Sequence, residues 1–203
     1  MLFQLNVKMT NMKLHNLPYL LVYSRVIFGL IIGITAIINP EFSGLIIAFL
    51  MLTGILTDVF DGVIARKLKV DTKKLRVLDS NVDLFFWVVA ILSVFGLNIH
   101  FMIDNIFLIF LVTFLEFLAY LITFLKFRKP IATHTYLAKF WSVLLFLFLT
   151  ELVVSRQSHF LFHSVIWVGV FSRLEISGIL LLSGEWVVDV SSVFHLQSSK
   201  KNS

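Results

Sequence analysis

The chain has 203 residues, of which 59% are hydrophobic and only 14% are charged. Soluble domains carry about 25% charged residues, so this composition favours a protein that lies largely in lipid. The formal net charge of +5 would suit nucleic acid, but so apolar a chain leaves no broad polar face for a polyanion, and we expect no nucleic-acid partner. The sequence contains no cysteine, which excludes disulfides, thiolate nucleophiles and cysteine metal ligands.

Six stretches are long and apolar enough to cross a bilayer, whose hydrocarbon core of about 30 Å needs roughly 20 apolar residues per helix. The first stretch is too long for the core of a cleavable signal peptide, so we interpret it as a retained membrane helix. An all-α integral membrane protein with six transmembrane helices is therefore predicted. The expected helices are residues 19–39, 43–65, 79–98, 103–125, 136–155 and 160–182.

No internal repeat or linker interrupts these helices, so we expect one membrane domain, residues 19–183. Residues 1–18 are interpreted as a cytoplasmic juxtamembrane segment. In residues 184–203, apolar side chains recur at helical spacing between polar ones, which is typical of an interfacial amphipathic helix. A frayed cytoplasmic tail fits the same residues.

Positive charge predicts the orientation of the helices, because cytoplasmic loops of membrane proteins are enriched in Lys and Arg. One side of the predicted topology has two such residues before the first helix, six after the second, three after the fourth and two in the tail, whereas the other side has only Arg156. Both termini should therefore be cytoplasmic. The charged residues of that side are Lys8, Lys13, Arg66, Lys67, Lys69, Lys73, Lys74, Arg76, Lys126, Arg128, Lys129, Lys200 and Lys201.

Two pairs of aspartates stand near the cytoplasmic ends of the second and third predicted helices. Asp58 and Asp61 are three residues apart, and Asp79 and Asp83 are four apart, so each pair lies on one face of its helix. Four such carboxylates at a membrane edge repel one another unless they are protonated or bind a multivalent cation. Oxygen ligands without His or Cys favour Mg²⁺ or Mn²⁺, and two such ions can assist a phosphoryl displacement.

Small residues and a cation follow the first aspartate pair. Gly62 has no side chain and would let a phosphate approach the helix backbone, and Ala65, one turn along, keeps that groove shallow. Arg66 carries a permanent charge on a planar group that matches phosphate oxygens. Together with the carboxylates, these residues predict a surface for metal and phosphate.

This spacing resembles the motif of the CDP-alcohol phosphotransferases, D-x2-D-G-x2-A-R-x8-G-x3-D-x3-D. Seven of the eight fixed positions match, and the departure is Leu75, where the family usually has glycine. Pro18 and Arg25 are similar to the start of the family's first helix, which extends the resemblance over roughly residues 18–145. The matching positions are Asp58, Asp61, Gly62, Ala65, Arg66, Asp79 and Asp83.

The resemblance implies a six-helix fold, a homodimer and dependence on Mg²⁺ or Mn²⁺, with two ions bound. Asp58, Asp61 and Asp79 would bind the metals, and Asp83 would share a metal and serve as general base. The active site would face the cytoplasm, and a bacterial inner membrane is the expected location.

The resemblance also implies the substrates. Gly62, Ala65 and Arg66 would line the site for the CDP moiety. CDP-diacylglycerol with a small alcohol acceptor is the expected pair in phospholipid synthesis. CDP-choline or CDP-ethanolamine with a lipid alcohol is the reverse arrangement, and a non-catalytic protein that binds a divalent ion or lipid headgroup is the alternative that Leu75 leaves open.

Three further charges lie in or beside apolar stretches, where a charge is costly unless it is paired or meets water. We expect Arg25 either to pair with Glu116 or to hold an anionic group of the acceptor. Lys139 either attracts phosphate or extends to the interface.

The orientation can be tested with introduced thiols, because the sequence has no cysteine of its own. In intact cells, Lys73→Cys should resist a membrane-impermeant maleimide, whereas Asn105→Cys should be labelled, since the two positions are expected on opposite sides. The reverse labelling pattern would reject the predicted topology.

Overall fold

The computed structural model describes residues 17–68, 70, 72–128 and 135–183, and no strand occurs among them. The predicted segments 1–18 and 184–203 lie almost entirely outside these residues. The chain divides into two compact units, Met1–Asn98 and Ile99–Ser203. The boundaries of the single domain expected for residues 19–183 stay a prediction.

The first unit contains α2 (Leu17–Ile38), α3 (Ser43–Lys67) and α4 (Lys73–Leu97). The second contains α5 (Ile99–Asp104), α6 (Ile106–Phe127), α7 (Tyr136–Ser155) and α8 (Phe160–Leu182). All of these except the short α5 are long and apolar enough to cross a membrane. The prediction of an all-α protein with six membrane-spanning helices is thus confirmed, with most helix ends within three residues of those expected.

Local chemistry explains several helix ends. The hydroxyl of Thr72 accepts a hydrogen bond from the Leu75 amide at the start of α4, at 3.2 Å, and Thr135 does the same for Ala138 in α7, at 3.1 Å. Such N-caps satisfy amide groups that have no partner within the helix. The short α5 was not predicted as a separate helix. It follows Asn98, whose side-chain amide donates back to the Val94 carbonyl at 2.7 Å.

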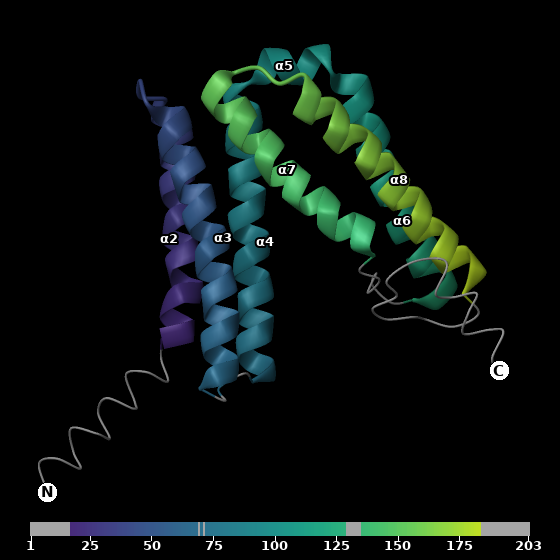
Figure 1. Cartoon of the computed structure of the whole chain (residues 1–203), viewed down its shortest axis with the longest axis horizontal. Helices are drawn as coiled ribbons and strands as arrows, with labels where there is room; N and C mark the ends of the chain where they lie inside the picture. The colour runs from purple at the N-terminus through teal and green to yellow at the C-terminus, as the bar shows by residue number, and fades with distance from the viewer. Residues whose placement is uncertain (1–16, 69, 71, 129–134, 184–203) are drawn as a thin grey trace, which may run out of the picture. The chain divides into compact units, whose positions relative to one another are not determined.

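In the first unit, α2 packs against both α3 and α4, which hardly contact each other. Figure 1 shows these three long helices with their axes roughly aligned. The buried positions of α2 recur every three or four residues and form one stripe along the helix. Many large apolar side chains of the unit are exposed, as expected for surfaces that face lipid. The buried residues of α2 are Pro18, Val22, Arg25, Gly29, Ile32 and Thr35.

In the second unit, α8 is the middle helix and packs against α6 and α7. The Lys126 ammonium, near the end of α6, donates hydrogen bonds to the carbonyl oxygens of Leu180, Leu181 and Ser183 at 2.8–2.9 Å. These carbonyls lie at the C-terminal end of α8, where they have no amide partner within the helix. Lys126 thus caps α8 from a neighbouring helix.

The absence of a side chain at Gly54 is essential to the packing of the first unit. A Cβ at this position would lie 2.7 Å from Cε1 of Phe86, whose ring is almost fully buried. We therefore expect Gly54→Ala to destabilise the protein by about 1–3 kcal/mol, because the ring has no free space to enter.

A thermal melt of the detergent-solubilised protein would measure this loss. Gly96→Ala is the matched control, since no atom lies within 4 Å of an added Cβ at that position. It should leave the melting temperature unchanged or raise it slightly, because alanine favours the helix by about 1 kcal/mol over glycine. Equal effects of the two substitutions would contradict this account of Gly54.

Candidate metal and phosphate site

The four aspartates of the predicted motif converge on one side chain, Arg25 of α2. Arg25 is fully buried. Its Nη1 donates hydrogen bonds to Asp58, at 3.0 Å, and to Asp83, and its Nη2 donates to Asp61 and Asp79. Asp58 and Asp61 belong to α3, and Asp79 and Asp83 to α4. Each terminal nitrogen therefore joins one carboxylate of α3 to one of α4.

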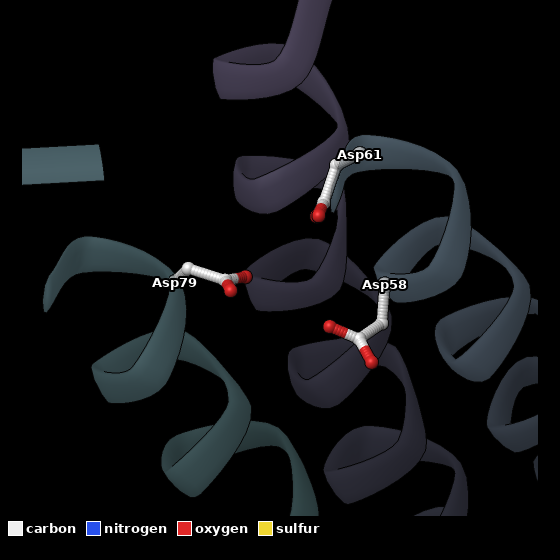
Figure 2. Close-up of side chains that lie close together, drawn as sticks. All are labelled: Asp58, Asp61 and Asp79. Carbon is white, nitrogen blue, oxygen red and sulfur yellow. The ribbon is translucent and has the colours of Figure 1, made fainter. Parts of the chain in front are cut away.

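Three of these carboxylates have the geometry of a metal-ligand group. Asp58, Asp61 and Asp79 each offer an oxygen atom, and the three atoms lie within 4.8 Å of one another. Figure 2 shows the three side chains directed into the same space between α3 and α4. Opposite ligands of an octahedral Mg²⁺ are about 4.2 Å apart, since each lies about 2.1 Å from the ion. Small side-chain rotations would thus bring these oxygens onto one ion.

The charges of the site also fit a divalent cation. One guanidinium faces four carboxylates, so three formal negative charges remain uncompensated by the ion pairs of this cluster. The Asp61 side chain is 5% exposed, whereas that of Asp58 is 46% exposed. The cluster is therefore buried at one end and open at the other, as a site needs to be if an ion and a substrate are to enter. Asp83 is not one of the three grouped ligands but shares Arg25 with them.

A cavity of about 380 Å³ adjoins the aspartates. All three residues predicted to bind the CDP moiety line it. One part of its wall is apolar and the other carries two carboxylates and a guanidinium, so the cavity can receive a ligand with both phosphate and less polar parts. Its lining residues are Pro18, Val22, Asp61, Gly62, Ala65, Arg66, Leu75 and Asp79.

Gly62 and Arg66 are neighbours within this wall. An added Cβ on Gly62 would lie 3.5 Å from Nη1 and 3.8 Å from Nη2 of Arg66. The guanidinium of Arg66 thus folds back over the glycine, one turn before it on the same face of α3. This arrangement places a permanent cation beside the backbone at Gly62.

Leu75 occupies the wall of the same cavity. Its side chain is 5% exposed and belongs to a buried cluster with Val22, Ala65 and Val82, one or more residues from each of the three helices. The leucine therefore fills volume beside Gly62 and Ala65 that a glycine would leave open. Leu75 also contributes to the packing of α2, α3 and α4 beside the site.

The predicted pair of Arg25 and Glu116 is wrong. Arg25 bonds the four aspartates, and Glu116 of α6 instead accepts a hydrogen bond from Nε of Arg173 in α8. The guanidinium of Arg173 also lies over the ring of Trp141, 3.7 Å from its centroid. Lys139, near the start of α7, is exposed.

The sequence interpretation did not anticipate how residues of α2 contribute to the site. Arg25 was noticed, but its aspartate partners were not, and Pro18 and Val22 of the cavity wall were not expected there. A signal was present, because Pro18, Val22 and Arg25 are spaced four and three residues apart and so share one face of a helix. That face could be recognised as the one directed toward the aspartates.

Fold and site together define a membrane protein of several helices with an acidic cluster and an adjoining cavity that contains an arginine. The chain belongs to the CDP-alcohol phosphatidyltransferase family, whose model matches residues 15–174. This match includes α2, α3 and α4 and every residue of the predicted motif. Membership supports a transferase of lipid synthesis that displaces CMP from a CDP-alcohol. No curated protein and no solved structure matches the chain.

Proposed function

We propose that the protein transfers a phosphatidyl group from CDP-diacylglycerol to a small alcohol and releases CMP, in a reaction that depends on Mg²⁺ or Mn²⁺. The observation that carries this proposal is the convergence of four carboxylates from two helices beside a cavity lined by Gly62, Ala65 and Arg66. Family membership supports the class of reaction. The donor, the acceptor and the metal are our proposal.

In this proposal Asp58, Asp61 and Asp79 hold the metals, and Asp83 shares a metal and serves as general base. Their spacing supports this assignment, since three of the carboxylates already lie within reach of one another. Bound divalent ions would neutralise negative charge on the diphosphate and on the departing CMP. The open end of the cluster, at Asp58, is the more accessible route to it.

The chain's own side chains would then bind and orient the substrate. Arg66 would donate hydrogen bonds to the phosphate oxygens of the CDP moiety, and Gly62 and Ala65 would let that moiety lie close to α3. The apolar part of the cavity wall, with Val22 and Leu75, would receive the less polar portion of the nucleotide. These contacts would fix the phosphorus atoms relative to the carboxylates.

The chemical step would be an in-line displacement. The acceptor hydroxyl attacks the phosphorus that bears the diacylglycerol moiety, and its proton passes to the Asp83 carboxylate as general base. The bond from that phosphorus to the bridging oxygen breaks, and CMP leaves with that oxygen. The products are a phosphodiester lipid and CMP, so atoms and charge balance without another reactant.

We further propose that this reaction takes place on the cytoplasmic face of a bacterial inner membrane and that the enzyme is a homodimer. The distribution of Lys and Arg supports the orientation. The homodimer and the bacterial membrane rest on the family resemblance alone.

The proposal can be tested with purified protein in detergent, Mn²⁺ or Mg²⁺, CDP-diacylglycerol and pools of small alcohols, with CMP and lipid products identified by mass spectrometry. We expect CMP and one new phospholipid from one pool. Asp61→Asn and Asp79→Asn should form no product and should lose the increase in melting temperature that Mn²⁺ gives the wild type.

A parallel reaction with CDP-choline and diacylglycerol tests the reverse arrangement. Product from that reaction alone would replace CDP-diacylglycerol as the donor. If no combination yields CMP although Mn²⁺ stabilises the protein, the non-catalytic alternative is favoured. Unchanged metal stabilisation in both aspartate variants would refute the shared site.

Leu75 is expected to determine how closely the nucleotide approaches α3. Leu75→Gly would enlarge the cavity beside Gly62 and Ala65, so KM for CDP-diacylglycerol should fall by about fivefold or more while kcat changes less. The variant should also melt at a lower temperature, because truncation of a buried leucine costs about 2–5 kcal/mol.

Leu78→Gly is the matched control for this effect. Leu78 packs against the same buried cluster, one turn further along α4, but does not line the cavity. It should lower the melting temperature and leave KM unchanged. If both variants alter KM equally, or neither does, Leu75 is not a specificity residue.

A further inference from the structure

We propose that Arg25 is a built-in counter-cation of the aspartate cluster, which holds the four carboxylates together in the metal-free protein and competes with divalent ions for their oxygen atoms. This inference rests on the metal site of the proposed function and adds a role for a residue of α2, outside the aspartate motif. It predicts that the wild-type chain binds metal more weakly than its carboxylates alone would allow.

The first step of the argument is the position of the guanidinium. Arg25 is fully buried on the middle helix of its unit, and α3 and α4 have few contacts with each other. Nη1 joins Asp58 to Asp83, and Nη2 joins Asp61 to Asp79, so both bridges between the acidic faces of the two helices pass through this side chain. Without a cation at this point, the like charges of α3 and α4 would repel one another.

The second step is that arginine and metal need the same atoms. The guanidinium is bonded to Oδ1 of Asp58, Oδ2 of Asp61 and Oδ1 of Asp79, one oxygen of every member of the proposed ligand group. An ion held by these three residues would lie close to the guanidinium and be repelled by it. Arginine does not lose its proton in proteins, so the repulsion cannot be relieved by neutralisation of Arg25.

The third step is that the side chain is not fully satisfied where it lies. Nε of Arg25 is buried and has no hydrogen-bond partner. A buried donor without a partner is unfavourable, so it offsets part of the stabilisation that Arg25 gains from its four ion pairs. A divalent ion at the same oxygen atoms would therefore compete with an arginine whose ion pairs are partly offset by one unsatisfied donor.

The test is a Mn²⁺ titration of the purified full chain in detergent, with free Mn²⁺ measured by electron paramagnetic resonance and a thermal melt of the metal-free protein. Arg25→Met should lower the melting temperature without metal, because the carboxylates lose their cation. It should also lower the Kd for Mn²⁺ by about tenfold or more, since a positive charge next to the ion is removed.

Arg173→Met is the matched control. Arg173 is also a buried arginine on the middle helix of its unit, and it contacts Glu116 and Trp141 rather than the aspartates. It should lower the melting temperature and leave the Kd for Mn²⁺ unchanged. A purely structural role of Arg25 would give the same result for both variants.

Arg25→Lys keeps the positive charge but has a single nitrogen, which cannot bridge both pairs of carboxylates as the two arginine nitrogens do. Its Kd for Mn²⁺ should lie between those of the wild type and Arg25→Met, and it provides the test if Arg25→Met does not fold. A Kd equal to or higher than that of the wild type in the folded variants would overturn the inference. If the wild type itself binds no Mn²⁺, the metal site of the proposed function fails instead.

Discussion

The contact between one buried arginine and four carboxylates is the interaction on which the rest of the first unit depends. Close approach of four carboxylates at a partly buried site is costly without a cation, and Arg25 supplies one from within the fold. This requirement explains why α2 lies against both α3 and α4, since only a helix in that position can reach both acidic faces. The cavity is formed next to this contact, by residues of the same three helices.

The second unit also contains a buried arginine that is paired with an acid of a neighbouring helix. This residue, Arg173 of the middle helix α8, bonds an acid of one neighbouring helix and lies over an aromatic ring of the other. The difference is the charge balance within the described part of the chain, because Arg173 forms an ion pair with Glu116 whereas Arg25 forms ion pairs with four carboxylates. A balanced pair stabilises helix packing, and an excess of negative charge leaves capacity for a further cation.

Sequence alone predicted what depends on local spacing. Length and hydropathy located the six long helices. The spacing of three residues between Asp58 and Asp61, and of four between Asp79 and Asp83, placed each pair on one face of its helix. The partners of Arg25 were not predictable in this way, because they lie 33 to 58 residues away and depend on which helices pack together. The motif singled out Leu75 as a departure, but its place in the cavity wall and its contacts with Val22 and Val82 required the packed helices.

The few contacts between α3 and α4 make α2 a spacer whose side-chain volumes set the distance between the two acidic faces. Gly29 lies one turn from Arg25, and an added Cβ there would be 3.1 Å from the Phe85 ring of α4. A larger residue at this position would press on the Phe85 ring and on the α4 backbone at Phe86, so the spacing between α2 and α4 depends on the small volume of Gly29. Since Mg²⁺ and larger divalent ions differ in the ligand separation they prefer, the ion selectivity of the proposed metal site would depend in part on residues of α2 that are not among its ligands.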